Sequence, residues 1–373
     1  MSERCIILLG VGHTNAHVVR EWVKNPIPNC RLVCVSRFPK STYSGMLPGT
    51  LAGQFRPDEM EIDLNRLAVS AGAALILGDV TGVDWNQRTL HFADSNSIRF
   101  EAMSIGVGSV PAEINNIHSE QVVPVKPMQT FLKRLAVRFD KTIPRPGGQL
   151  QITIIGGGVA GIEIALCLLT GLRFELQFIK VSIRILTADD DIAKELPAPA
   201  RQKLNRILAT RGIEVISKTR VSEITESGVN ACDGRSYDSD CVIWAVGAIA
   251  PPVVSRLGLP LDDRGFILTK STLQSVADLP VFAVGDAGTI VGSTSPKAGV
   301  YAVRQSPILW HNLQALLADK PLIEFRPQRS FMKLLNTGDG KALLQYKNVS
   351  IHARWCWTLK TWIDRRFLRP FRV

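Results

Sequence analysis

The sequence predicts an α/β fold in which one Rossmann-like nucleotide-binding domain is inserted into another. Three observations predict it. Twice in the chain, at residues 5–24 and 152–169, a strand-like run leads into a glycine-rich turn that is followed by a helix-like run. Proline-rich segments enclose a helix-like stretch between the two copies and mark a boundary. After the second copy the chain returns to an apolar strand that ends in Gly285-Asp286.

The second copy has the more complete turn. Gly156, Gly158 and Gly161 have the spacing of a turn that holds a pyrophosphate on the exposed N–H groups of the following helix. Gly156 permits the tight turn, Gly158 lets the phosphate approach the backbone, and Gly161 lets the helix pack against the strand. Glycine-rich turns also follow strands for purely structural reasons, so the motif alone leaves that alternative open.

The first copy departs from the motif at two places. Gly10 and Gly12 match the first two glycines, but Asn15 stands where the third is expected. The next strand ends in Ser36 and Arg37, where such a site usually carries an acid for the ribose hydroxyls. Ser36 can still hydrogen-bond to a hydroxyl, and Arg37 can meet a phosphate. The first turn is therefore a weaker match than the second.

Three further predicted strands end in small residues, at Gly108, Gly247 and Gly285. Asp286 follows the last of these strands directly. A buried Asp is costly unless another group hydrogen-bonds to it, and a sugar-alcohol chain is such a group. The alternative, a cap for the helix that begins near Ala298, is too far along the chain.

The segment 43–49 has an unusual composition, with an aromatic residue, small residues and Pro48. It is either a surface turn or a loop packed over a flat cofactor ring. The expected domains are residues 1–125 with 248–325 for the first, a linker and helix at 126–149, and the inserted domain at 150–247. Residues 326–373 are expected to form an α+β or helical C-terminal segment.

Composition excludes several classes of protein. Hydrophobic residues make up 46% of the chain, enough for sizeable cores, and no apolar run of about 18 residues could span a membrane. The first residues lack the features of a signal peptide, so a cytoplasmic location is expected. The seven cysteines are scattered and lack CxxC spacing, which favours reduced thiols and no metal site.

The net charge of +11 implies an acidic partner, and much of it lies near the C-terminus. From residue 341 onward there are eight basic residues and a single acid, Asp364. No recognised nucleic-acid-binding motif accompanies this charge, so a nucleic-acid partner is not expected.

The last predicted helix is basic and amphipathic. One stripe carries Trp355, Leu359, Trp362, Ile363 and Phe367, and the remaining surface carries Arg354, Lys360, Thr361, Asp364 and Arg365. Such a helix with Trp on its apolar face is typical of a segment that lies in a membrane interface. The alternative is an ordinary helix that docks on the first domain or on a second subunit in a homodimer.

Together these residues resemble the two-dinucleotide-fold flavoproteins of the pyridine nucleotide–disulfide oxidoreductase superfamily, which have a glutathione reductase-like fold. The resemblance covers residues 1–320. Within the superfamily the chain looks like the type II NADH dehydrogenase branch. It resembles most closely the flavoprotein domain fused to selenide, water dikinase in some bacteria, on the segments 43–49, 125–127, 298–304 and 362–367.

The resemblance implies that the first domain binds FAD and the inserted domain binds NADH or NADPH. The residues implied for FAD are Gly10, Gly12, Ser36, Arg37, Pro48, Gly108, Gly285 and Asp286. Those implied for NAD(P)H are Gly156, Gly158, Gly161, Thr187 and Gly247. Asp286 would hold the ribityl chain of FAD.

Two residues are implied to be catalytic. Glu163 matches a glutamate that lies near flavin N5 in the family, so it would orient the nicotinamide or pass a proton. Its alternative role is that of an acid favoured by the helix dipole. Lys126 would approach the flavin, although a lysine in a linker can simply be solvated.

Two departures limit what the resemblance implies. The disulfide branch of the superfamily needs a pair of redox cysteines beside the flavin, and none exists here, which argues against a lipoamide or glutathione type of reductase. At the end of the second strand of the inserted domain stands Thr187, with Asp189 two residues on and no Arg or Lys for a 2′-phosphate. NADH is therefore expected in preference to NADPH.

The expected function is FAD-dependent oxidation of NADH or NADPH, with a quinone as the leading electron acceptor. The acceptor pocket is expected at Lys297, Tyr301 and Gln305, with Tyr43 facing it. One alternative is a soluble flavin reductase for a protein, selenium or sulfur acceptor. The other is a non-catalytic flavoprotein.

Overall fold

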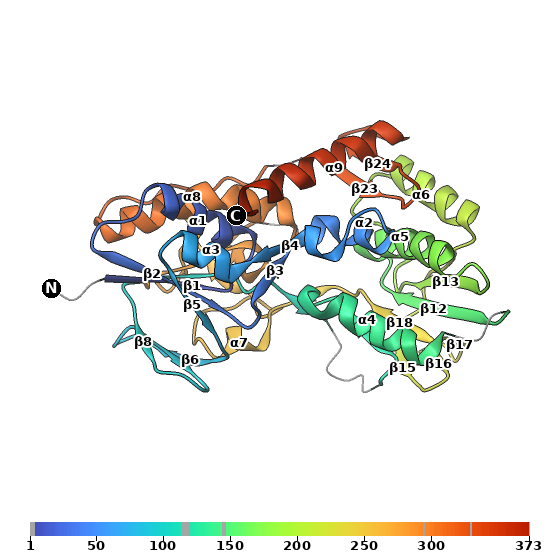
Figure 1. Cartoon of the computed structure of the whole chain (residues 1–373), viewed down its shortest axis with the longest axis horizontal. Helices are drawn as coiled ribbons and strands as arrows, with labels where there is room; N and C mark the ends of the chain where they lie inside the picture. The colour runs from blue at the N-terminus through green and yellow to red at the C-terminus, as the bar shows by residue number, and fades with distance from the viewer. Residues whose placement is uncertain (1–3, 113–118, 144–146, 294, 329, 373) are drawn as a thin grey trace.

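The computed structural model describes residues 4–112, 119–143, 147–293, 295–328 and 330–372. Two five-stranded parallel sheets form the centres of two domains that lie side by side along the long axis of the molecule (Figure 1). A C-terminal segment lies across both domains. The predicted α/β fold class is confirmed.

The first sheet has the strand order β21-β9-β1-β2-β5, and all its neighbouring strands are parallel. Its strands are β1 (Arg4–Leu9), β2 (Cys30–Ser36), β5 (Ala74–Leu77), β9 (Ala102–Ile105) and β21 (Val281–Ala283). The last of these comes from beyond the second domain in the sequence, so the predicted insertion is confirmed.

The helices α1 (His13–Lys24) and α8 (Gly299–Leu317) pack on one face of this sheet, where Trp22 and Trp310 meet edge to face with ring centres 6.2 Å apart. The short helix α7 (Pro252–Ser255) lies on the other side in Figure 1. Among the described residues, further short helices of this domain are α2 (Leu47–Leu51), α3 (Leu64–Ser70), η1 (Ser44–Met46), η2 (Pro57–Met60) and η4 (Gly285–Ala287).

The second sheet has the order β11-β18-β12-β13-β14 and is also parallel. Its strands are β11 (Val122–Pro124), β12 (Gln149–Ile155), β13 (Lys180–Leu186), β14 (Glu214–Ile216) and β18 (Cys241–Trp244), and its helices are α4 (Met128–Thr142), α5 (Val159–Glu175) and α6 (Ala198–Arg211). Because β11 hydrogen-bonds to β18, it belongs to this sheet, whereas the boundary expected at residue 125 placed it in the first domain.

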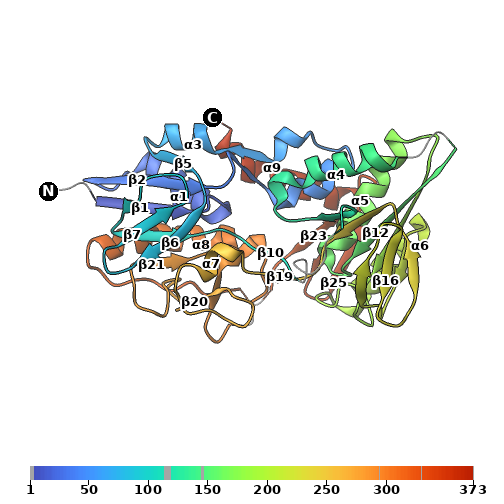
Figure 2. The same ribbon diagram turned by 90° about the horizontal axis from the view of Figure 1, so that it is seen from below.

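Smaller sheets complete both domains. Their strands are β3 (Lys40–Thr42), β4 (Glu61–Asp63), β6 (Val80–Asp84), β7 (Thr89–Phe92), β8 (Ile98–Arg99), β10 (Val110–Pro111), β15 (Val221–Ile224), β16 (Gly228–Ala231), β17 (Ser236–Asp238), β19 (Ala248–Ile249), β20 (Ile267–Thr269) and β22 (Gly288–Ile290). The two segments that cross between the domains pair with each other as β10 and β19 (Figure 2).

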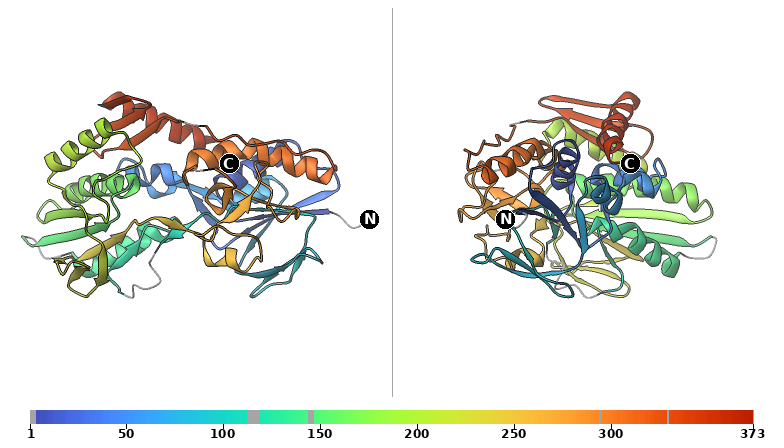
Figure 3. Two further views of the ribbon diagram at one scale, coloured as in Figure 1. Left: turned by 180° about the vertical axis from the view of Figure 1, so that it is seen from behind. Right: turned by 60° about the vertical axis from the view of Figure 1, so that its left-hand side comes forward.

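The C-terminal segment is α+β, which is one of the two alternatives expected. The antiparallel strands β23 (Lys333–Asn336), β24 (Ala342–Tyr346) and β25 (Val349–Ala353) lead into α9 (Arg354–Leu368) and the turn η5 (Arg369–Phe371). The helix starts over the second domain and ends beside α1 of the first (Figures 1 and 3). Among the described residues, no helix is long and apolar enough to cross a membrane.

A helix that docked on the protein through its predicted apolar stripe would bury the tryptophans and expose its charged residues. The orientation of α9 differs from this. Trp355 and Trp362 are 51% and 56% exposed, whereas Lys360 and Asp364, expected on the polar surface, are buried. The two buried charges tolerate this position because they form an ion pair at 2.9 Å with each other. The two tryptophans therefore face outward, whereas Phe367 of the same stripe packs on Tyr43.

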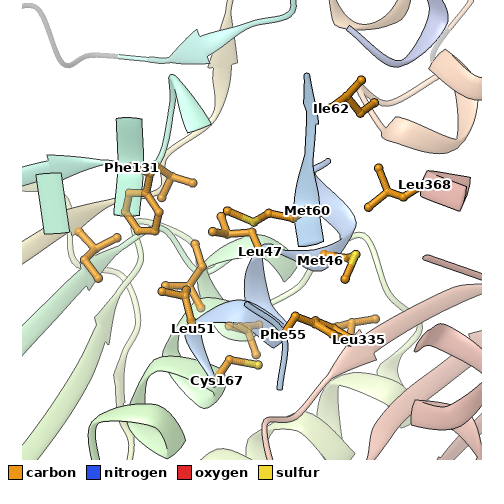
Figure 4. Packing of buried hydrophobic residues seen from close by; sticks show 14 of the residues in the cluster. Met46, Leu47, Leu51, Phe55, Met60, Ile62, Phe131, Cys167, Leu335 and Leu368 are labelled. Carbon is orange, nitrogen blue, oxygen red and sulfur yellow. The ribbon is translucent and has the colours of Figure 1, made fainter. Parts of the chain in front are cut away.

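The domains and the C-terminal segment share one hydrophobic core around α2. Figure 4 shows Leu47 and Leu51 of α2 among side chains from α4, α5, β23 and α9. The contact between α2 and α5 is close, since a Cβ atom at Gly171 would lie 2.1 Å from the carbonyl oxygen of Leu51. This core joins the two domains to each other and to the C-terminal segment.

Candidate functional site

The first glycine turn closes tightly against the end of β9. Gly10 has a φ of +80°, and a Cβ atom there would lie 2.7 Å from the backbone of Gly106. Any other residue would therefore clash and be strained. The close approach shapes a cradle of backbone at the N-terminus of α1, where a pyrophosphate can bind.

Asn15, which replaces the third glycine of the motif, supports this turn. Its Nδ2 donates a hydrogen bond to the carbonyl oxygen of Gly10 at 2.8 Å, and Ser104 Oγ donates to its Oδ1 at 2.7 Å. The side chain is fully buried. Through these two hydrogen bonds Asn15 connects the start of α1 to the ends of the neighbouring strands, which a glycine achieves by close packing. The turn therefore remains intact.

Asp286 lies beside the first turn. A Cβ atom added to Gly285 would lie 3.8 Å from Thr14 Oγ1 in the first turn of α1. Asp286 Oδ2 accepts hydrogen bonds from Ser109 Oγ at 2.7 Å and from Lys126 Nζ at 3.0 Å. Burial raises the pKa of this carboxyl, but the charge of Lys126 and the two hydrogen bonds outweigh burial and hold the pKa below its usual value. The carboxylate is therefore ionised and suited to accept hydroxyl donors.

The cradle and the carboxylate together fit FAD, whose pyrophosphate would lie on α1 and whose ribityl hydroxyls would reach Asp286. Other residues expected at this site have local partners. Ser36 Oγ donates to the carbonyl oxygen of Phe38 at 2.8 Å, and Arg37 pairs with Asp79 at 2.6 Å on the surface. Pro48 is buried in α2, and Gly108 has a φ of +74° with no atom within 4 Å of an added Cβ. Their contacts with FAD stay predictions.

The second glycine turn is closed at two positions and open at a third. Cβ atoms at Gly156 and Gly161 would lie 2.5 Å from Ala245 O and 2.1 Å from Gly156 O. At Gly158 the nearest atom, Glu195 Oε1, is 3.8 Å away. A side chain at Gly158 would therefore have room, but Glu195 Oε1 accepts a hydrogen bond from Val159 N at 2.9 Å at the N-terminus of α5, so a phosphate would have to displace this carboxylate. The expected Gly247 is similarly open, with nothing within 4 Å of an added Cβ.

We expect Gly158→Val to fold and to retain FAD but to bind NADH at least about tenfold more weakly, because the side chain blocks charge-assisted bonds from backbone to phosphate. Gly158 has an extended φ of −72°, which valine tolerates. Equilibrium titration of the yellow protein with NADH measures the loss. The matched variant Gly161→Val should fail to fold, because its side chain meets the carbonyl oxygen of Gly156. Wild-type NADH affinity in Gly158→Val would place the nucleotide elsewhere.

The end of β13 differs from the expected site in two ways. Thr187 is 4% exposed and packs under Gly157, whose added Cβ would lie 2.7 Å from it, so the threonine faces the turn. Lys194, which the sequence analysis missed, pairs with Asp189 at 3.1 Å and with Asp190 at 2.6 Å. The expectation that no basic residue lies here was wrong. The loop after β13 folds back and places Lys194, five residues after Asp189, beside the two aspartates.

Glu163 is half-buried on α5, where it contacts the C-terminal segment. Its Oε1 accepts a hydrogen bond from the backbone N–H of Asn336 at 2.7 Å. Burial raises the pKa of Glu163 to about 7, while the charge of Lys360 and the Asn336 hydrogen bond oppose that rise. A carboxyl group with this pKa can hold or release a proton near neutral pH.

A buried polar network connects Glu163 electrostatically to the first domain. Lys360 Nζ donates to the carbonyl oxygen of Gly45 at 2.6 Å and to Asp364 Oδ2 at 2.9 Å. Tyr43 OH donates to Asp364 Oδ1 at 3.0 Å. Burial lowers the pKa of Lys360, but the charges of Asp364 and Glu163 outweigh burial, so it stays charged. The spacing of four residues between Lys360 and Asp364 is the sequence signal from which this ion pair could have been predicted. The sequence analysis instead placed both side chains in solvent.

The expected acceptor residues are divided between two places. Lys297, Tyr301 and Gln305 line one cavity of about 440 Å³ beside Gly285. Burial lowers the pKa of Lys297 to about 8, and Gln305 Oε1 accepts a hydrogen bond from Gly285 N at 2.6 Å. Tyr43, which was expected to face this cavity, does not line it and instead binds Asp364.

Neither a disulfide nor a cluster of potential metal ligands occurs among the described residues. All seven cysteines lie in this part of the chain and none forms a disulfide there, and Cys34, Cys167 and Cys241 are buried thiols whose pKa burial raises. No group of three or more His, Cys, Asp or Glu side chains within the described ranges could hold a metal ion.

The sequence profile of the family described as "Pyridine nucleotide-disulphide oxidoreductase" matches residues 6–312. The chain is 30% identical to "Demethylphylloquinone reductase NdbB" of Synechocystis sp., over 84% of this chain and 78% of that protein. Its fold is similar to that of NDH2 from Plasmodium falciparum in complex with NADH, with a TM-score of 0.80, 13% identity and coverage of 99% and 97%. It is also similar to the sulfide:quinone oxidoreductase of Aquifex aeolicus, with a TM-score of 0.80, 16% identity and coverage of 99% and 91%.

Proposed function

Because the chain belongs to the pyridine nucleotide-disulphide oxidoreductase family, we propose that it transfers electrons from NADH through FAD to a quinone. Membership in the family makes it an FAD-dependent NAD(P)H dehydrogenase with two nucleotide-binding domains. The relative at 30% identity, named as a reductase of demethylphylloquinone, supports a quinone as the acceptor. The absence of a cysteine pair among the described residues also supports it, since the acceptor must then meet the flavin directly.

The observation that carries this proposal is the buried network of Glu163, Lys360, Asp364 and Tyr43 between the two domains. FAD, when bound, supplies the chemistry that accepts a hydride and passes the electrons on. Reduction of a quinone by NADH consumes one further proton from the protein or solvent. Glu163, whose pKa burial raises to about 7, can hold that proton between the two domains.

The other residues position the reactants. The open turn at Gly158 receives the pyrophosphate of NADH on the side of the second domain. The cavity with Lys297, Tyr301 and Gln305 lies beside Gly285 and receives the acceptor in this proposal. Lys126 acts through its bond with Asp286, which keeps that carboxylate ionised and oriented.

The acceptor is tested by mixing anaerobically NADH-reduced protein with single acceptors and following the return of the oxidised flavin spectrum. A menaquinone or ubiquinone analogue should reoxidise the flavin fastest. Selenite, a disulfide and a ferredoxin serve as the alternative acceptors. Faster reoxidation by one of these than by every quinone analogue would assign the chain to that acceptor instead.

We also propose NADH as the preferred donor. Asp189 and Asp190 lie at the end of β13, where the adenosine ribose of the dinucleotide would bind, and their charge disfavours a 2′-phosphate. Lys194 neutralises part of that charge. The preference should therefore be modest, and the ratio of kcat/KM for NADH and NADPH measures it.

A membrane surface is the place where a lipid-soluble quinone would be met, and α9 presents a suitable face. Trp355 and Trp362 are exposed, and a surface hollow of about 330 Å³ is lined by Trp362 and four arginines, Arg365, Arg366, Arg369 and Arg372. In this proposal the protein is cytoplasmic and binds peripherally, and each arginine near an anionic surface contributes about 1 kcal/mol.

We expect the protein to co-sediment with vesicles that contain anionic phospholipid and not with purely neutral vesicles. The double variant Trp355→Ser/Trp362→Ser should lose this binding. The matched control is Phe174→Ser/Phe178→Ser, which removes two phenylalanines that are 78% exposed on the second domain. Equal vesicle binding by the two double variants would contradict a membrane-docking role of α9. If the protein is instead a dimer that only the Trp355→Ser/Trp362→Ser variant dissociates, this face binds a second copy of the chain.

A further inference from the structure

The loop that joins β13 to α6, residues 187–197, is attached to the second glycine turn through its backbone. The backbone N–H of Ala193 donates to the carbonyl oxygen of Gly157 at 2.7 Å, and Ala193 is 1% exposed. From the C-terminal segment, Lys333 Nζ donates to the carbonyl oxygen of Glu195 at 3.0 Å. These contacts do not involve the Glu195 side chain, so that side chain can change without displacing the loop.

The Glu195 side chain caps α5 from this loop. Although the residue is exposed, its Oε1 accepts a hydrogen bond from the backbone N–H of Val159 at 2.9 Å. Gly158, the N-cap of α5, has no side chain that could accept this hydrogen bond. The Glu195 carboxylate therefore takes the place of an N-cap side chain, and the helix dipole favours its negative charge there. No motif of the sequence singles out Glu195.

A pyrophosphate on the second turn needs the donor that Glu195 holds. In a turn of this type the phosphate binds the N–H groups at the start of the helix. The single hydrogen of Val159 N cannot bond fully to two anions, and a carboxylate and a phosphate side by side repel each other. The dinucleotide must therefore displace Glu195, so its observed affinity is lower than that of a turn whose N–H groups are unoccupied.

We propose that Glu195 is a built-in competitor of the dinucleotide phosphates, and that it lowers the affinity of the second domain for NADH and NAD⁺ alike. This inference rests on the proposed function, which places NADH on the second glycine turn. NAD⁺ carries the same pyrophosphate as NADH. The return of Glu195 to Val159 N–H therefore also favours release of the oxidised dinucleotide after the hydride has been transferred.

Glu195→Ala removes the competing carboxylate and should bind NAD⁺ about three- to tenfold more tightly than the wild type, the factor that corresponds to one capping contact. Glu195→Gln keeps an acceptor for Val159 N–H but no charge that repels phosphate, so its affinity should lie between the two. Calorimetric titration of the FAD-loaded protein measures the dissociation constants, and NAD⁺ is the probe because it cannot reduce the flavin. ADP-ribose, which carries the pyrophosphate without the nicotinamide, should gain by the same factor.

Thermal denaturation distinguishes competition from a purely structural cap. Without dinucleotide, Glu195→Ala should melt at a lower temperature than the wild type, because α5 has lost its cap. With saturating NAD⁺ the difference should vanish, since the phosphate then occupies Val159 N–H in both proteins. A side chain that only stabilised the fold would instead lower the melting temperature by the same amount in both conditions, which would overturn the proposal.

Glu175→Ala is the matched control, because it removes the same charge from an exposed position at the opposite end of α5. It should retain the wild-type affinity for NAD⁺. Equal or weaker binding of NAD⁺ by Glu195→Ala than by the wild type overturns the proposal and leaves the proposed electron transfer from NADH to quinone untouched. If neither the wild type nor Glu195→Ala binds NAD⁺ or ADP-ribose, the proposed function fails and this inference fails with it.

Discussion

Glu163→Gln is expected to slow quinone reduction by about 10²-fold or more, the usual contribution of a positioned proton donor. The amide can still accept the hydrogen bond from Asn336 N, so the fold should persist. Wild-type turnover should fall as pH rises above about 7, because Glu163 then loses the proton that it delivers. The variant should show no such fall. Steady-state rates across this pH range measure both effects.

The step in which NADH reduces the flavin provides the control for Glu163→Gln. It transfers a hydride and needs no proton from Glu163, so its rate should change by less than about tenfold. Glu163→Asp keeps a titrating group and should recover part of the quinone activity. If Glu163→Gln turns over quinone at the wild-type rate with the wild-type pH profile, Glu163 serves only to bind Asn336.

Lys360→Met is expected to lower the free energy of unfolding by about 3–5 kcal/mol, the usual cost of leaving one buried charge without its partner. Lys360 and Asp364 have side chains 11% and 5% exposed, so water cannot replace the lost ion pair. Removal of the cation also raises the pKa of Glu163, which Lys360 lowers, and should move the fall in quinone activity to higher pH. Urea denaturation and the pH profile measure the two consequences separately.

The double variant Lys360→Met/Asp364→Leu distinguishes a buried charge from lost packing. Replacing both charges by apolar groups of similar size should restore most of the stability, because no unpaired ion remains. Tyr43 then loses its acceptor, which should leave a deficit of about 1–3 kcal/mol. A double variant as unstable as the single variant would show that the packing of α9, and not its ion pair, is what Lys360 supports.

The fold was predictable because its signals are local. The strand that enters Gly156 and the helix that contains Gly161 can be recognised from residues close together in the sequence, and both turns form as expected. The strand β11 was misplaced because its sequence does not say which sheet it joins. That choice is made by hydrogen bonds to β18, more than a hundred residues away.

The site was less predictable because its key contacts are long-range. Helical periodicity assigns Lys360 and Asp364 to the polar side of α9, where charges usually face water. Their burial depends on Tyr43 and Gly45, more than 300 residues earlier, which supply the partners. Asn15 shows the same limit, since its role in the first turn requires Ser104 from a neighbouring strand.

The central claim is that two nucleotide sites bring a flavin and a nicotinamide together without a sulfur intermediary. Anaerobic titration of the FAD-loaded protein with NADH, followed by flavin absorbance, tests it most directly. Full bleaching after a single equivalent of NADH per FAD is predicted, since each hydride carries the two electrons that one flavin accepts. A requirement for a second equivalent would reveal a redox disulfide, and a flavin that NADH cannot bleach would contradict the account altogether.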